Sequence, residues 1–101
     1  MAPLNWETVR ERYEADPVLH GIGTERALSV SRVEDERLYV STSMWTKTVE
    51  REHLEAAVRL MEDGELTRRV GDFVEQYGRQ VTKERRSLAA RVLQDLGYLR
   101  D

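Results

Sequence analysis

The apolar residues of this chain change their spacing twice, and that change restricts the possible fold more than any single motif does. Near the start they lie three and four positions apart, at Trp6, Val9 and Tyr13. This spacing predicts a helix over residues 5–15 with one apolar face. Asn5 is the expected N-cap, and Pro17 is expected to end the helix because proline disfavours a helical conformation in the residue before it.

Between residues 27 and 43 apolar and polar residues alternate instead, as in strands with one buried face. Two such runs, rich in β-branched residues, flank the acidic turn 34–36, so we expect a β-hairpin. The turn contains no Asn-Gly or Asp-Gly pair, which favours a longer loop or a bulge over a two-residue turn. An isolated hairpin is only marginally stable in water. It must therefore pack on helices or pair with a further strand, which a second chain could supply.

Helical spacing returns after the hairpin. A helix is expected over residues 48–62, with Thr46 or Thr48 as its N-cap. Gly64 follows directly after this helix, at a position where a left-handed backbone is common and glycine adopts it readily. The end of the second helix is therefore predicted at Asp63-Gly64.

Two further helices are predicted in the last third of the chain. The cleanest amphipathic pattern places apolar residues at Leu66, Val70, Phe73, Val74 and Tyr77. Gly71 lies within this third helix and is expected to permit close packing, and Gly78 is expected to end it. A fourth helix is expected to be capped by Thr82 and closed by Gly97, after which Tyr98-Leu99 folds back onto the core.

These elements predict a single α+β domain over residues 1–101: an N-terminal helix, a β-hairpin, and a compact three-helix bundle whose last two helices form a helix-turn-helix-like pair. A chain of 101 residues with 40% hydrophobic residues can bury one modest core. No apolar run approaches the roughly 20 residues that span a membrane, and no membrane partner is expected. The start of the chain lacks a basic stretch followed by an apolar one, so we expect a cytoplasmic protein.

The charge of the chain is unevenly distributed. Its net charge is −3, yet residues 66–92 contain seven basic residues against three acidic ones, a local charge of +4. An acidic protein that concentrates arginine on one helix pair can direct that face toward an anionic partner. A mixed, solvated surface with no binding role explains the same pattern.

The sequence therefore suggests a non-enzymatic binding module that contacts nucleic acid or another anionic surface. The expected nucleic-acid-binding residues surround the start of the fourth helix: Arg79, Lys83, Arg85 and Arg86. The recognition helix of a helix-turn-helix reads bases from its N-terminal turn, and basic side chains there also contact phosphates. Against this, any small bundle has short turns and surface arginines, and an acidic overall charge disfavours DNA.

The alternative is a protein-interaction or oligomerisation domain. In this interpretation the edge of the hairpin pairs with a partner strand, and the expected partner-binding residues are Trp45 and Tyr39. A second copy could serve as the partner, since its acidic turn 34–36 would complement the basic helices. Trp45 is equally explained as an anchor of the core.

Catalysis, metal binding and cofactor binding are not expected. The chain contains no cysteine, which excludes disulfides, thiolate catalysis and cysteine-ligated metals. Glu50 and His53 form one carboxylate–histidine pair, whereas di-metal bundles need two pairs and two further glutamates. The glycines of His20-Gly21-Ile22-Gly23-Thr24 resemble the start of a dinucleotide fingerprint, but Arg26 occupies the third glycine position and no strand precedes the loop.

Overall fold

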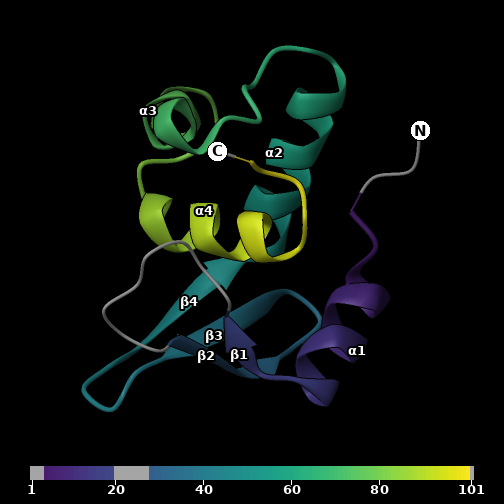
Figure 1. The fold of residues 1–101 in the computed structure, drawn as a ribbon, viewed down its shortest axis with the longest axis vertical. Helices are drawn as coiled ribbons and strands as arrows, with labels where there is room; N and C mark the ends of the chain where they lie inside the picture. Colours follow the sequence, from purple (N-terminus) through teal and green to yellow (C-terminus); the bar gives the residue numbers. More distant parts are fainter. Residues whose placement is uncertain (1–3, 20–27, 101) are drawn as a thin grey trace.

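An antiparallel sheet covered on one face by helices forms the body of the protein (Figure 1). The structure, a computed structural model, describes residues 4–19 and 28–100. Within these residues the elements run α1 (Trp6–Ala15), β1 (Val18–Leu19), β2 (Leu28–Val33), β3 (Arg37–Ser41), β4 (Thr46–Glu50), α2 (Arg51–Glu62), α3 (Val70–Gln80) and α4 (Arg86–Asp95). The strands lie in the sheet in chain order, each antiparallel to its neighbour. The α+β class is confirmed.

The first helix follows the sequence prediction closely. Asn5 is its N-cap, and the Asn5 side chain accepts a hydrogen bond from the backbone N–H of Thr8 at 3.2 Å. The apolar face of the helix is buried, and α1 lies alongside the sheet next to β2 (Figure 1). The indole N–H of Trp6 donates to the carbonyl of Glu34, which fastens the start of α1 to the turn between β2 and β3.

The predicted hairpin is confirmed as β2 and β3. Its pairing register shifts between Val30 and Arg32, so the expected irregularity is a bulge within β2. Leu38 and Val40 face the core and are fully buried. The opposite face is polar, and the hydroxyl of Ser41 lies 3.0 Å from those of both Ser31 and Thr46. One apolar face and one hydroxyl-rich face explain why helices cover only one side.

Residues 46–50 form strand β4, and the prediction that Thr46 or Thr48 caps a helix was wrong. Thr48 pairs with Tyr39 of β3, and Val49 turns into the core. Threonine is common both as a helix cap and within strands. Here pairing with β3 selects the strand. Helix α2 starts at Arg51, directly after the strand, without a side-chain cap. The short strand β1 was also not predicted.

The boundaries of the last two helices differ from the prediction at their shared connection. Gly78 does not end α3; it is buried inside it, and a Cβ atom there would lie 2.7 Å from Cδ of Arg86. The close approach expected at Gly71 therefore occurs at Gly78, because nothing lies within 4 Å of a Cβ built at Gly71. Thr82 does not cap α4; its hydroxyl accepts from the N–H of Glu84 within the connection.

Two helix ends agree with the prediction. Gly64 and Gly97 follow α2 and α4 with φ of +78° and +94°, the left-handed conformation that glycine adopts without steric cost. Beyond Gly97 the chain returns to the core, where Leu99 is buried. A bridge between Arg69 and Arg100 then holds the last residues beside the start of α3.

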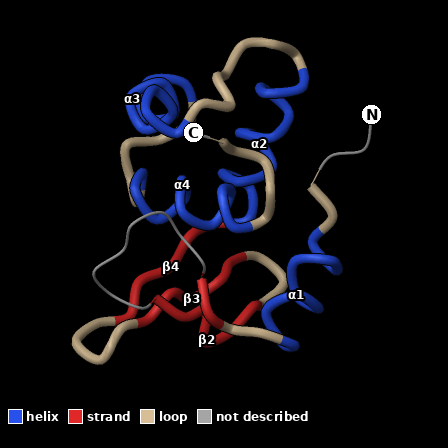
Figure 2. The backbone as a smooth tube through the Cα atoms, in the orientation of Figure 1, coloured by secondary structure: helices blue, strands red, loops and turns tan. Residues whose placement is uncertain are grey.

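The three C-terminal helices form a layer on the sheet and share its core (Figure 2). α3 packs chiefly on α4, α2 packs on β3 and β4, and α4 lies between α3 and the sheet. The predicted compact three-helix bundle with a helix-turn-helix-like pair is not confirmed, because the helices and the sheet share one core. In the part of the chain that the structure describes, no helix has the length and apolar character needed to cross a membrane.

Candidate functional site

The arginines that the structure describes between residues 10 and 51 have acidic partners. All five make ion pairs at 2.8–3.1 Å: Arg10, Arg12, Arg32, Arg37 and Arg51. Their charge is therefore largely neutralised within the protein.

The basic segment, which we define as residues 79–86, carries its charges differently. All four predicted nucleic-acid-binding residues are exposed there: Arg79, Lys83, Arg85 and Arg86. Arg79 approaches Glu75 at 3.8 Å, but both side chains are largely exposed, so the pair contributes little. The other three make no ion pair with any residue between 4 and 19 or 28 and 100. The end of α3, the connection and the start of α4 thus present four exposed basic residues against one exposed acidic residue, Glu84.

Helix α4 offers only its first turn to solvent. Arg86 and Ser87 are exposed, whereas every residue from Leu88 to Asp95 is buried or half-buried. A recognition helix needs a long exposed face to enter the major groove. The exposed charge accordingly belongs to the connection and to the two helix ends.

Arg85 has a left-handed backbone, with φ of +55°, and is the only non-glycine residue with positive φ among those described. For a residue with a side chain this conformation costs roughly 1–2 kcal/mol. Arg85 is the residue immediately before α4. Strained residues of this kind cluster at functional sites, where the surrounding structure maintains the strain.

Arg85 also lines a small cavity of about 80 Å³. The wall combines four elements of the fold, namely β4, the first turn of α2, α3 and the connection before α4. The lining residues are Thr48, Val49, Glu50, His53, Tyr77, Glu84 and Arg85. Residues far apart in the sequence are therefore brought together beside the edge strand β4.

Tyr77 is the buried member of this wall. Its side chain is fully buried, yet its hydroxyl has no hydrogen-bond partner among the residues that the structure describes. Burial raises the pKa of Tyr77 to about 12, so the hydroxyl stays protonated at neutral pH and can donate a hydrogen bond. A buried hydroxyl without a partner carries a desolvation penalty of about 1–3 kcal/mol.

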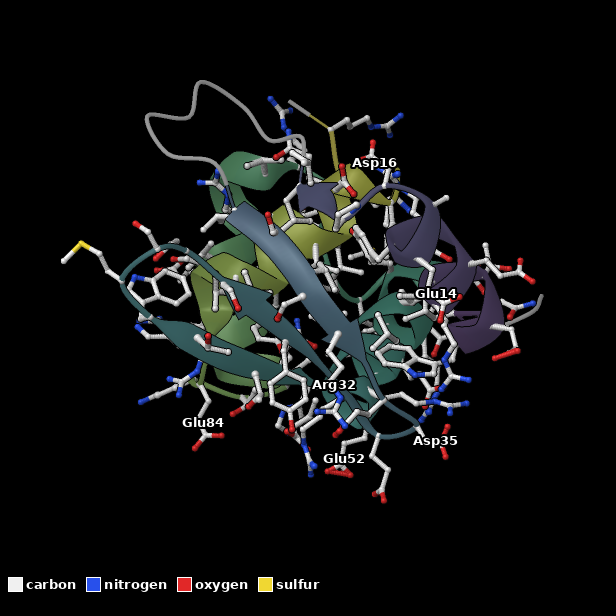
Figure 3. All side chains as sticks on the ribbon, turned by 90° about the horizontal axis from the view of Figure 1, so that it is seen from below. Glu14, Asp16, Arg32, Asp35, Glu52 and Glu84 are labelled. Atoms are coloured by element: carbon white, nitrogen blue, oxygen red, sulfur yellow. The ribbon has the colours of Figure 1, made fainter. Side chains whose placement is uncertain are left out.

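Two acidic residues in the same wall have other roles. The carboxylate of Glu50 accepts hydrogen bonds from Nε and Nη2 of Arg37, at 3.0 and 3.4 Å. Glu84 is exposed, and its side chain extends outward from the body of the molecule (Figure 3). Glu50 is therefore already paired, and Glu84 is solvated.

The two predicted partner-binding aromatics do not lie together. Trp45 is half-buried against the core, with the ammonium of Lys47 4.9 Å from its ring centre. Tyr39 lies on the outer face of the sheet, where Arg32 approaches its ring at 5.9 Å and its hydroxyl donates to Glu34. Each ring thus has its own neighbouring cation. The two rings do not form one surface, because Trp45 packs against the core and Tyr39 lies on the outer face of the sheet.

Among the described residues, no group of three or more histidine, cysteine, aspartate or glutamate side chains is arranged to hold a metal ion. The Glu50–His53 pair faces the small cavity, and Glu50 is engaged by Arg37. The glycine-containing loop around Gly21 and Gly23 lies outside the described residues.

Comparison with known proteins adds no relative. Neither a family model, nor a curated protein, nor a solved structure matches the chain. A functional proposal therefore depends on the geometry described above.

Proposed function

We propose that this protein is a non-enzymatic binding module that contacts nucleic acid through the basic segment. The observation that supports the proposal is a contrast in ion pairing: the described arginines between residues 10 and 51 have acidic partners, whereas Lys83, Arg85 and Arg86 have none among the described residues. Exposed, unpaired cations grouped on one segment are the usual means of binding phosphates. A cytoplasmic location, as expected from the sequence, is part of the same proposal.

The buried position of α4 determines the mode of contact. Because only its first turn is exposed, the segment meets the phosphate backbone, and α4 does not enter the major groove as the helix-turn-helix outline suggests. Backbone contacts confer affinity with little sequence specificity. For duplex DNA, the logarithm of the binding constant falls with the logarithm of the salt concentration, with a slope of about −0.9 for each neutralised phosphate. Three or four phosphate contacts from the basic segment correspond to a slope of about −3.

The test is a fluorescence-anisotropy titration of labelled duplex DNA and of single-stranded DNA and RNA at low and near-physiological salt. The decisive variant is Arg85→Glu/Arg86→Glu. Its matched control is Arg68→Glu/Arg69→Glu, which makes the same charge change before the opposite end of α3. We expect the first variant to abolish salt-sensitive binding and the control to weaken it only modestly. Binding that ignores salt, or equal losses in both variants, would contradict the proposal.

A second candidate function is protein interaction along β4. Among the described strands, β4 pairs only with β3, so its other edge is available for a partner strand beyond the small cavity. The loop that leads into β4 also exposes an apolar side chain, because Met44 is 76% exposed there. Light scattering across a range of concentrations tests self-association through this edge. A mass that rises with concentration and returns to that of the monomer in Thr48→Pro, which removes an N–H on the free edge of β4, would support it.

A further inference from the structure

Two arginines from distant parts of the chain lie side by side at the start of α3. A parallel backbone bridge pairs Arg69 with Arg100, and the end of the chain returns to α3 to form it (Figure 1). The N–H of Arg100 donates to the carbonyl of Arg68 at 2.9 Å, and the N–H of Val70 donates to the carbonyl of Arg100 at 2.9 Å. Residues paired across such a bridge project their side chains to the same side.

The positive charge gathered here has no acidic partner among the described residues. We define the arginine cluster as Arg68, Arg69 and Arg100. Arg69 and Arg100 are exposed, Arg68 is half-buried, and none of the three makes an ion pair within residues 4–19 and 28–100. In the two segments that build the bridge and the first turn of α3, residues 67–73 and 98–100, Asp72 is the only acidic residue. Like charges opposite each other across a bridge repel, and a bound anion removes that repulsion.

The first turn of α3 adds a free amide beside the arginine cluster. The N–H groups of Val70 and Asp72 donate to backbone carbonyls, whereas the N–H of Gly71 has no acceptor among the described residues. Gly71 is exposed, and nothing lies within 4 Å of a Cβ built there. An anion can therefore approach this amide directly, at the positive end of the helix dipole.

The donors at this site suit a phosphate group better than a carboxylate. A phosphate monoester carries a charge of about −1.5 to −2 near pH 7 and presents three acceptor oxygens. It can therefore meet two guanidinium groups and one amide at the same time. A carboxylate has a single charge and two oxygens, so it leaves more of the positive charge uncompensated.

We infer that the arginine cluster, together with the Gly71 amide, binds one phosphate group as its dianion. Arg69 and Arg100 contact the phosphate oxygens, and Arg68 adds a third positive charge. The site lies at the start of α3, whereas the basic segment begins near the other end of this helix. The inference therefore does not rest on the proposed contact with nucleic acid.

The test uses the full chain in phosphate-free buffer at constant ionic strength. Inorganic phosphate is added while NMR follows the backbone amide signals of the glycines, with acetate in a parallel titration. We expect a saturable shift of the Gly71 amide with phosphate, a weaker one with acetate, and none at Gly78, which is buried further along the same helix. A Gly71 shift that does not saturate, or tighter binding of acetate, would overturn the inference.

Three variants test the charges that hold the anion. Arg100→Ala removes one guanidinium and should weaken phosphate binding at least about threefold, as expected for an exposed charge pair. Asp72→Asn removes the nearby negative charge and should tighten binding by a similar factor. Arg79→Ala removes the same charge roughly 15 Å further along α3, and there the affinity should stay within about 1.5-fold. Unchanged affinity in both Arg100→Ala and Asp72→Asn would contradict the inference.

Two further measurements assign the source of the phosphate and separate this site from the proposed function. Phenyl phosphate that binds as tightly as inorganic phosphate would assign the site to a phosphate monoester, and phenyl phosphate that does not bind would assign it to the free ion. Arg85→Glu/Arg86→Glu should lose DNA binding and keep the Gly71 shift. A Gly71 shift in a wild-type protein that binds no DNA would remove the proposed function and leave the phosphate site intact, and DNA binding without that shift would do the reverse.

Discussion

The carboxylate of Asp95, at the end of α4, accepts two hydrogen bonds from Nη2 of Arg12 in α1, at 2.9 and 2.8 Å. The Asp95 side chain is only 1% exposed, whereas that of Arg12 is 31% exposed. The hydroxyl of Tyr13 donates to the same carboxylate at 2.7 Å. One buried acidic group therefore joins the first helix to the last.

The first prediction concerns this junction. Asp95→Ala leaves a buried tyrosine hydroxyl and a partly buried guanidinium without their acceptor, so the free energy of unfolding should fall by about 2–4 kcal/mol. Urea denaturation followed by circular dichroism measures the change. Glu62→Ala, at the exposed end of α2, serves as the control and should stay within about 0.5 kcal/mol. A loss below about 1 kcal/mol in Asp95→Ala would show that the junction contributes little.

The N-cap of α1 gives a second prediction. Asn5→Ala removes the side chain that accepts from the Thr8 N–H and should lower stability by about 1 kcal/mol. Asn5→Asp and Asn5→Ser restore an acceptor and should recover most of the loss. Thermal denaturation compares the three variants. If all three are equally destabilised, the cap hydrogen bond is not the cause.

A third prediction follows from the backbone of Arg85. With φ of +55°, Arg85→Gly should be more stable than Arg85→Ala by about 1 kcal/mol, because only glycine enters this region without a steric penalty. Inside a helix the order would be reversed, since alanine is favoured there by about 1 kcal/mol. The sign of the difference, measured by urea denaturation, therefore reports whether α4 begins after Arg85 or earlier.

The fourth prediction is a pH dependence. Burial raises the pKa of Tyr77 to about 12, against 10 for an ordinary tyrosine. Between these values the unfolded chain releases the proton and the folded protein keeps it. The free energy of unfolding should thus fall by about 1.4 kcal/mol per pH unit from this residue as pH rises from 10 to 12.

Urea denaturation of wild type and Tyr77→Phe between pH 8 and 11.5 checks this dependence. Near pH 8 the variant should be at least as stable as wild type, because it removes a buried hydroxyl that has no partner among the described residues. Above pH 10 the advantage of the variant should grow. Curves that stay parallel up to pH 11.5 would rule out the raised pKa.

Local signals in the sequence predicted much of this fold. Asn5 and Pro17 delimit α1, the alternation of residues 27–43 predicts β2 and β3, and Gly64 and Gly97 mark two helix ends. Each of these depends on a conformational preference of one residue or on a short periodic pattern. Such preferences act within a few residues of the chain, so they can be recognised without knowing the fold.

The errors occurred where a distant partner decides the structure. Thr46 and Thr48 could begin a helix or form a strand, and pairing with β3 selects the strand. Thr82 could cap a helix, but α4 starts four residues later, directly after the left-handed Arg85. The apolar stripe of α3 correctly predicts that Tyr77 is buried. That its hydroxyl has no partner among the described residues depends on how neighbouring elements pack, which no local pattern encodes.

The junction between Arg12 and Asp95 also orders the assembly of the chain during synthesis. The two residues are 83 positions apart. At about 5–20 residues per second, Arg12 leaves the ribosome several seconds before its acceptor does. In that interval the strands can pair in the order in which they emerge, because neighbours in the sheet are neighbours in the chain. The junction between α1 and α4 therefore closes only after every strand of the sheet has emerged.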